Sequence, residues 1–282
     1  MKFVTFQKAG QNPEAGALVG DRVVGLAGAG CPTIFDVLSA GAVARPGIES
    51  WIASNAGFPL SAVTLLAPIP RPPKLICVGL NYRDHAIESK MEIPKVPTIF
   101  CKFPSSVIAP GESIVLPKTS TQPDYEAEFA FVIGKGGRHI KAENWQEHVF
   151  GYTIINDVSA RDYQMATTQW LMGKTFDTFA PMGPAIVSAD EIADPHALDI
   201  GLSINGETLQ HSNTRELIFK IPQLIEFLSS VFTLETGDVV STGTPAGVGV
   251  ARKPQRFLRA GDNVVVSIQG LGELRNPVVA EN

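Results

Sequence analysis

Three carboxylates in this sequence have a spacing that could bind a divalent cation. Glu126 and Glu128 are separated by one residue in the segment DYEAEFAFVIG, and residues two apart on a β-strand point to the same face. Asp157 follows the apolar run 150–155 and offers a third carboxylate. Because like charges beside an apolar strand repel each other and are costly to bury, they need a cation, and oxygen ligands favour Mg²⁺, Mn²⁺ or Ca²⁺. Each pattern alone is also typical of an exposed strand or a turn.

A histidine and a glutamate could move a proton next to such a cation. His85 and Glu88 lie three residues apart directly after the apolar run LICVGL, so one helical turn would place them on the same face. A carboxylate beside an imidazole orients the ring and raises its basicity, which is what a general base needs. The same spacing also occurs in surface ion pairs.

Two further segments carry groups that could meet an anionic ligand. Lys174 stands before a Pro/Gly-rich loop and could contact a carboxylate or an enolate oxygen, although it could equally be a surface lysine. The loop 241–249, STGTPAGVG, follows an apolar strand, and its backbone N–H groups could hold an anion. It lacks the Lys-Ser/Thr ending of a P-loop, so nucleotide binding is unsupported.

The elements that position these residues are predicted to be mostly strands. Asn205-Gly206 between two strand-like runs predicts a hairpin, since a type I′ turn needs two positive φ angles. Helices are predicted for Arg161–Met172, for Pro222–Phe232 and for a short segment capped by Thr33. The predicted strands are 74–80, 97–103, Tyr125–Ile133, Phe150–Ile155, Gly183–Val187, Leu198–Ile204, Asp238–Ser241 and Asn263–Ile268.

The pattern predicts an α+β protein with a mixed β-sandwich or roll. Four prolines in residues 67–74 cannot lie in a helix or central strand, so we interpret this segment as a linker. It would separate a small N-terminal α+β domain, residues 1–70, from a strand-rich catalytic domain, residues 71–282. No GxGxxG motif follows a strand, so a dinucleotide fold is unsupported.

Composition excludes several classes of function. The net charge is −5 and no long basic run is present, which argues against nucleic acid as a partner. Three widely spaced cysteines form no CxxC pair, so a disulfide framework or thiolate zinc site is not expected. No secretory signal or apolar run of membrane-spanning length is recognised. We therefore expect a cytoplasmic enzyme with a small-molecule substrate.

Five segments in this order resemble the fumarylacetoacetate hydrolase superfamily, and they cover residues 79–249. They are GLNYRDHAIES, DYEAEFAFVIGK, GYTIINDVSARDYQ, GKTFDTFAPMGP and STGTPAGVG. The resemblance implies a homodimeric enzyme that binds Mg²⁺ or Mn²⁺. The roles that it implies are metal ligation by Glu126, Glu128 and Asp157, catalysis by His85, Glu88 and Lys174, and substrate binding by Gln164, Thr244 and Tyr82.

Two departures place the chain with the small-chain branch of that superfamily. Val78 stands where the longer founding enzyme has an extra acidic ligand, and Leu258 stands where it has a late catalytic glutamate. The branch includes acylpyruvate hydrolases, oxaloacetate decarboxylases and hydroxyheptadienedioate isomerases, so fumarylacetoacetate is not the expected substrate.

The resemblance implies hydrolysis of a C–C bond in a 2,4-diketo acid. In this hypothesis a metal polarises the 2-oxo end of the substrate, His85 activates a water, and the leaving group is a pyruvate enolate stabilised by the metal and Lys174. Decarboxylation of oxaloacetate and isomerisation of a keto acid would use the same residues. A homologue that binds metal or ligand without catalysis is a further alternative.

Overall fold

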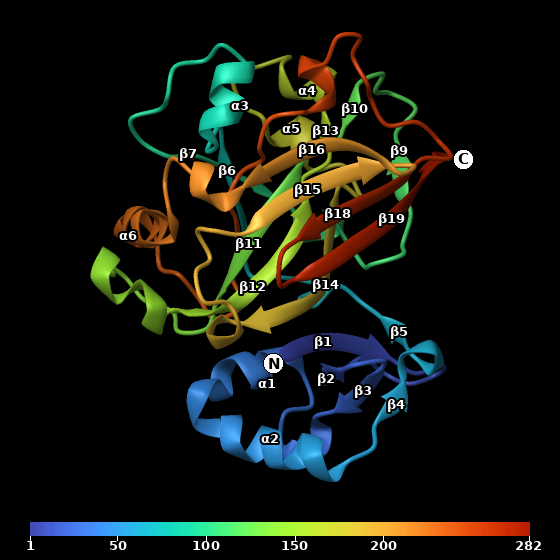
Figure 1. Cartoon of the computed structure of the whole chain (residues 1–282), viewed down its shortest axis with the longest axis vertical. Coiled ribbons are helices and arrows are strands. Elements are labelled where there is room, and N and C mark those ends of the chain that lie inside the picture. The colour runs from blue at the N-terminus through green and yellow to red at the C-terminus, as the bar shows by residue number, and fades with distance from the viewer.

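The computed structural model describes residues 1–282, apart from the side chain of Ala42. Two large sheets dominate the fold (Figure 1). Among the described helices, none has the length and apolar character that a membrane span requires.

The larger sheet has twelve strands and runs in the order β4-β3-β2-β1-β14-β12-β11-β17-β6-β7, with β5 paired to β1 and β8 paired to β14. Its strands are β1 (Lys2–Gln7), β2 (Glu14–Val19), β3 (Arg22–Gly25), β4 (Phe58–Pro59), β5 (Thr64–Leu65), β6 (Leu75–Gly79), β7 (Thr98–Lys102), β8 (Val107–Ile108), β11 (Ala127–Ile133), β12 (Val149–Asn156), β14 (Ala180–Ser188) and β17 (Val239–Ser241).

The second sheet has five strands in the order β16-β15-β18-β19-β9, and β10 pairs with β13 separately. The strands are β9 (Ile114–Leu116), β15 (Asp199–Ile204), β16 (Glu207–Asn213), β18 (Asn263–Ile268), β19 (Gly272–Ala280), β10 (Pro123–Asp124) and β13 (Ser159–Ala160). Most neighbours are antiparallel, whereas β17–β6, β14–β8 and β19–β9 are parallel. The expectation of a mixed, strand-rich α+β fold is therefore confirmed.

Six α-helices and several 3₁₀ turns connect the described strands. The α-helices are α1 (Ile34–Ala40), α2 (Arg45–Ser54), α3 (Arg83–Glu88), α4 (Arg161–Gln164), α5 (Leu171–Lys174) and α6 (Ile221–Val231). The 3₁₀ turns are η1 (Ala27–Ala29), η2 (Gly41–Ala44), η3 (Leu60–Ala62), η4 (Pro104–Ser106), η5 (Ala142–Glu147), η6 (Ala189–Glu191), η7 (Thr214–Glu216) and η8 (Gly249–Ala251).

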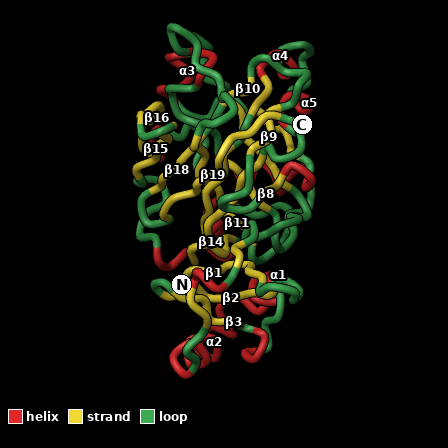
Figure 2. The backbone as a smooth tube through the Cα atoms, turned by 90° about the vertical axis from the view of Figure 1, so that its right-hand side faces the viewer, coloured by secondary structure: helices red, strands yellow, loops and turns green.

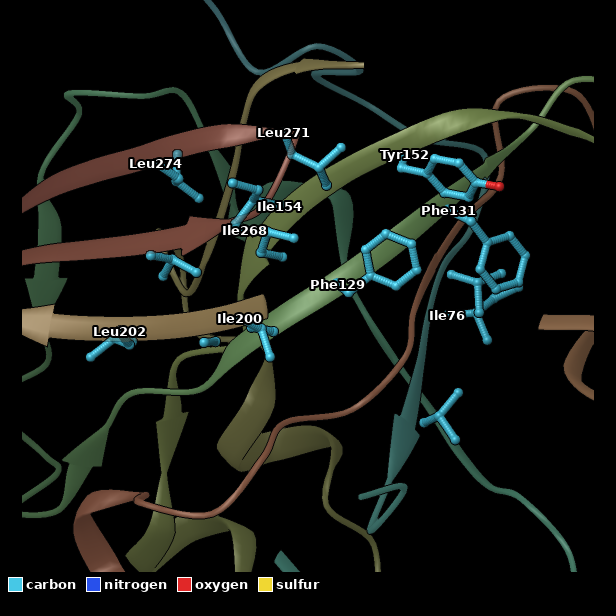
Figure 3. Close-up of a cluster of buried hydrophobic side chains, with 14 of the residues drawn as sticks. Ile76, Phe129, Phe131, Tyr152, Ile154, Ile200, Leu202, Ile268, Leu271 and Leu274 are labelled. Atoms are coloured by element: carbon cyan, nitrogen blue, oxygen red, sulfur yellow. The ribbon is translucent and has the colours of Figure 1, made fainter. Parts of the chain in front are cut away.

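Strand β11 lies at the centre of the fold and is buried on both faces. Phe129, Phe131 and Ile133 point into the core shared with the five-stranded sheet, whereas Ala130 and Val132 point into the core on the opposite face. This alternation follows from the two-residue period of a strand. Figure 3 shows the first core, where side chains of β11 and β12 meet those of β15 and β18.

The N-terminal segment continues the large sheet instead of forming a separate one. Strand β1 pairs with β14, with Phe3 opposite Ile186. Phe3 and Leu38 also share one core with Ala130 and Val132 of the central region. Sheet and core thus run across the proline-rich segment, and the division into domains at residue 70 stays a prediction.

The helix predicted for Arg161–Met172 is wrong, because two short helices replace it. Between α4 and α5, Thr167 Oγ1 donates to the Gln169 carbonyl oxygen at 3.0 Å and accepts from the Gln169 N–H at 3.1 Å. Such side-chain bonds compete with the helical pattern of the backbone. The other predictions hold: Thr33 caps α1, and Asn205-Gly206 with two positive φ angles joins β15 to β16.

Helices α3, α4 and α5 gather at one end of the molecule, opposite the N-terminal strands and helices. Both views show this arrangement (Figures 1 and 2). The segments that carry His85, Gln164 and Lys174 therefore lie at the same end of the central strands.

We predict that truncating a central side chain costs much stability. Phe131→Ala should lower the free energy of unfolding by about 3–5 kcal/mol, because Phe131 is fully buried between the sheets. The control Val279→Ala, at a side chain that is 39% exposed, should change it by about 0.5 kcal/mol or less. Denaturant unfolding of both variants measures the difference, and equal effects would contradict the two-faced burial of β11.

Candidate metal centre and active site

The register of two neighbouring strands brings the predicted carboxylates together. β11 pairs antiparallel with β12, with Ala127 opposite Asn156. The residues just outside this pair, Glu126 and Asp157, are therefore adjacent, and the Asp157 N–H donates to the Glu126 carbonyl oxygen at 2.9 Å. Glu128 lies two residues further along β11. One carboxylate oxygen from each acid lies within 4.8 Å of the other two, and all three residues are buried.

Three buried cations contact this acidic cluster. Lys174 Nζ lies 2.7 Å from Glu126 Oε2 and 2.8 Å from Asp157 Oδ2. Lys102 Nζ lies 2.6 Å from Asp157 Oδ1, and Arg161 Nη1 lies 2.7 Å from Glu126 Oε1. Burial would lower the pKa of Lys174, but the charges of Asp157 and Glu126 hold it above its ordinary value. Lys174 is therefore a cation in the folded protein.

The cations leave one negative charge uncompensated. They face the three clustered carboxylates and also Asp124, which accepts a hydrogen bond from Arg161 Nε at 2.9 Å. Burial, and then the charges of Asp157 and Glu126, raise the pKa of Glu128 well above its ordinary value. Burial would also raise the pKa of Glu126, but the charges of Lys174 and Arg161 bring it to about 2.

The cluster fits a divalent cation and could hold one. Its donors are carboxylate oxygens, the ligands that Mg²⁺ and Mn²⁺ prefer. Both hydrogen bonds to Glu128 go to Oε2, from Ser241 Oγ at 2.5 Å and Gly243 N–H at 3.1 Å, which leaves Oε1 for a ligand. An added positive charge would also offset the repulsion from Asp157 and Glu126 that helps to raise the pKa of Glu128.

The predicted pair of His85 and Glu88, here called the dyad, lies on a single turn of helix. His85 Nδ1 lies 3.4 Å from Glu88 Oε2 in α3, and both oxygens of Glu88 accept from the Gly247 N–H at 3.0 Å. Asp84 accepts from the His85 N–H at 2.7 Å and from Ser212 Oγ at 2.5 Å. Burial raises the pKa of Glu88, but the hydrogen bonds from His85 and Gly247 outweigh it and lower the pKa.

A single cavity of about 440 Å³ joins the dyad to the acidic cluster. It is lined by both charged or polar and apolar side chains. Of the residues predicted from the sequence, the cavity brings together His85, Glu88, Glu126, Glu128, Gln164, Lys174 and Thr244.

Two predicted residues lie behind this wall. Asp157 is fully buried and lies behind Lys174 and the other two acids of the cluster, which line the cavity. Tyr82 is also fully buried and pairs with Leu217 through a β-bridge. It is not among the described lining residues. Its assignment to substrate binding stays a prediction that this position does not support.

Several contributors to the site are not predicted from the sequence. Lys102 and Arg161 reach the carboxylates from separate elements, and Asp124 accepts from the Gly249 and Val250 N–H groups at 2.7 and 2.9 Å. Trp170 also lines the cavity. Two of these residues carried a local signal in the sequence. Lys102 stands in the apolar run IFCKF, and Asp124 stands two residues before Glu126.

We predict that Mn²⁺ or Mg²⁺ stabilises the folded protein through Glu128. At a metal concentration about 100 times Kd, the gain should be about 2.7 kcal/mol, seen as a rise in Tm. Glu128→Gln should abolish the rise, because it removes a ligand charge. Glu147→Gln, at an exposed carboxylate paired with Lys135, should keep it. A rise that survives Glu128→Gln would place the ion elsewhere.

Comparisons with known proteins show the family of this chain. The family described as Fumarylacetoacetate (FAA) hydrolase C-terminal matches residues 74–279. The chain is 53% identical over 221 residues to the mitochondrial oxaloacetate tautomerase fahd2 of Xenopus laevis, covering 78% of this chain and 69% of that protein.

The crystal structure of maleylpyruvate hydrolase from Sphingobium sp. SYK-6, with manganese(II) and pyruvate, has a TM-score of 0.86 at 30% identity, with full coverage of both chains. The 2-hydroxyhepta-2,4-diene-1,7-dioate isomerase from Mycobacterium marinum has a TM-score of 0.80 at 32% identity, covering 100% of this chain and 99% of that one. The chain belongs to the fumarylacetoacetate hydrolase family.

Proposed function

We propose that this protein is a metal-dependent keto–enol tautomerase of a 2-oxo acid of the oxaloacetate type. One observation carries the proposal: the His85–Glu88 pair lines the same cavity as Glu126 and Glu128, two members of the buried acidic cluster. The 53% identical relative named as an oxaloacetate tautomerase supports this choice among the reactions that such a site could perform.

Glu126, Glu128 and Asp157 would hold Mg²⁺ or Mn²⁺. A bound divalent cation supplies a Lewis acid that polarises the keto group of a 2-oxo acid. Lys174 and Arg161 add fixed positive charge at the same wall of the cavity. Charge that develops on the substrate oxygen is thereby stabilised by groups that need no rearrangement.

His85 would transfer the proton. Its Nδ1 faces Glu88, so Nε2 is the nitrogen left to exchange the proton on the carbon next to the keto group. Glu88 would keep the ring oriented for this transfer. The low pKa of Glu88 keeps its carboxylate charged at neutral pH.

Hydrolysis of a C–C bond in a 2,4-diketo acid is the second candidate. The cavity of about 440 Å³ has room for a substrate longer than oxaloacetate, and the 30% identical neighbour is named as a maleylpyruvate hydrolase. This reaction would need a water beside His85 and would release pyruvate. Decarboxylation of oxaloacetate would also release pyruvate but needs no such water.

Three other expectations stay predictions. A homodimer is implied by the family resemblance alone. A cytoplasmic location is an expectation from the sequence alone, whereas the relative from Xenopus laevis is named as mitochondrial. The alternative of a homologue without catalysis is disfavoured by the dyad, which is intact and faces the cavity.

An exchange assay tests the proposed reaction. With Mg²⁺ or Mn²⁺, the protein should accelerate loss of enol-oxaloacetate absorbance and incorporation of solvent deuterium at C3, and chelator should stop both. His85→Asn should lower kcat by about 10²–10⁴-fold, whereas His211→Asn, at an exposed histidine outside the cavity, should not. Pyruvate release from a 2,4-diketo acid without accelerated exchange would favour the hydrolase instead.

We predict that a single methyl group at Gly247 disrupts the dyad. Gly247 has φ +104°, and a Cβ there would lie 2.2 Å from the Leu209 carbonyl oxygen, so Gly247→Ala must displace the N–H that binds Glu88. We expect kcat to fall at least about tenfold. Gly261→Ala is the matched control, because Gly261 has φ +93° and open space around it. Equal losses of activity in the two variants would point to backbone strain instead.

A further inference from the structure

A buried glutamine joins the five-stranded sheet to the wall of the cavity. Gln210 lies on β16 and is 1% exposed. Its Oε1 accepts from the Ala127 N–H at 2.9 Å, and its Nε2 donates to Thr244 Oγ1 at 2.8 Å and to the Pro245 carbonyl oxygen at 2.9 Å. Thr244 is among the described lining residues and Gln210 is not. The amide of Gln210 therefore reaches the cavity through Thr244.

The partners of this amide determine which of its ends is the oxygen. A backbone N–H can only donate, so the amide atom that faces Ala127 must be the oxygen. A carbonyl oxygen can only accept, so the amide atom that faces Pro245 must be the nitrogen. Both contacts require the same orientation, and the group that Gln210 presents to Thr244 is consequently a donor.

A hydroxyl that accepts from an amide keeps its own proton for another acceptor. Thr244 Oγ1 has one O–H donor and two lone pairs, and the bond from Gln210 uses one lone pair. Among the side-chain hydrogen bonds of the described residues, this is the one that Thr244 makes. Because Thr244 lines the cavity, its O–H is available to an acceptor that binds there.

This hydroxyl lies next to the acidic cluster. Ala127, the other partner of the amide, stands between Glu126 and Glu128 in the sequence. The Gly243 N–H, one residue before Thr244, donates to Glu128 Oε2 at 3.1 Å. In the proposed function the 2-oxo acid end of the substrate binds beside these carboxylates. The acceptor that this end brings to Thr244 is the carboxylate next to the keto group.

We propose that Gln210 is a positioning residue that directs the Thr244 hydroxyl toward the carboxylate next to the keto group of a bound 2-oxo acid. The inference rests on the proposed function for the nature of the ligand and concerns how the same site holds it. A hydrogen bond from a hydroxyl to a carboxylate is charge-assisted and about twice as strong as a neutral one. A donor whose direction is fixed beforehand loses little freedom when the ligand binds.

Gln210→Glu reverses the hydrogen bond to Thr244 while keeping the shape of the side chain. The new carboxylate still accepts from the Ala127 N–H, but it offers Thr244 an acceptor in place of a donor, so the hydroxyl turns away from the cavity. Oxamate, a 2-oxo acid analogue that cannot enolise, is the probe. Calorimetry in the presence of Mg²⁺ should show oxamate binding at least about tenfold more weakly to this variant.

Thr244→Val separates this effect from a general disturbance of the fold. It removes the hydroxyl and should itself weaken oxamate binding. In the Thr244→Val background, Gln210→Glu should weaken binding by less than about twofold further, because the group through which Gln210 acts is gone.

Asn276→Asp is the matched control, because it makes the same change from amide to carboxyl in the same sheet. Asn276 lies on β19, is 2% exposed, and donates to the carbonyl oxygens of Ala109 and Glu112 at 2.9 and 2.8 Å. It lies outside the described lining of the cavity. The control variant should leave oxamate affinity unchanged.

Gln210→Met is the second test variant, since a carboxyl group that stays protonated when buried could still donate one proton. Methionine has the length of glutamine but no donor, so the Thr244 hydroxyl loses its fixed direction, and oxamate should bind at least about threefold more weakly. In the exchange assay, each variant at Gln210 should raise KM by about the factor by which oxamate binding weakens. The value of kcat should change by less than about threefold, because the carboxylate is bound in both the ground state and the transition state.

The outcomes separate this inference from the proposed function. If oxamate binds the unchanged protein with Mg²⁺ but neither variant at Gln210 weakens it by more than about twofold, the inference is overturned alone. It is also overturned if the losses from Gln210→Glu and Thr244→Val multiply in the double variant, if Asn276→Asp weakens oxamate as much, or if kcat falls instead of KM rising. If oxamate does not bind the unchanged protein with Mg²⁺, the proposed 2-oxo acid site fails, and the role of Gln210 fails with it.

Discussion

The pairing of β11 with β12 is the constraint on which the site depends. Its register sets Glu126 beside Asp157 at the end of β11, which is fully buried, and β12, which is buried along most of its length. A shift by one residue would turn every side chain of the strand to the opposite face, which would move Glu128 and the core phenylalanines together. The hydrophobic pattern that fills both cores therefore also fixes where the carboxylates project.

At the paired ends of β11 and β12, the fold buries charged side chains, for which the loss of hydration is most costly. Replacing one partner of a buried ion pair leaves the other uncompensated, at a cost of about 3–5 kcal/mol. The charges of Lys102, Lys174 and Arg161 come from three separate elements. Such a network contributes little net stability compared with apolar packing. Its value is that the cationic groups are held in place before a ligand arrives, so little reorganisation is needed when charge develops.

The three clustered carboxylates and the His85–Glu88 dyad were predicted because their signals in the sequence are local. One-residue spacing in a strand and three-residue spacing in a helical turn decide which side chains share a face, and neither depends on distant contacts. The mixed strand-rich fold followed from the same periodicities. Lys102, Asp124 and Trp170 were missed because their roles arise from contacts between segments far apart in the chain. The segment after Arg161 was misinterpreted because the Thr167 side chain binds the backbone of Gln169.

The continuation of the sheet from β14 into β1 bears on how this chain could be divided. The region matched by the family begins at residue 74, but a fragment starting there would lose β1 from the edge of β14 and the side chains that cover one core. An open strand edge beside an uncovered apolar face is a template for pairing with other chains. Cutting the chain at the prolines would thus expose the edge of β14 as an aggregation site, although every residue that lines the cavity would be retained.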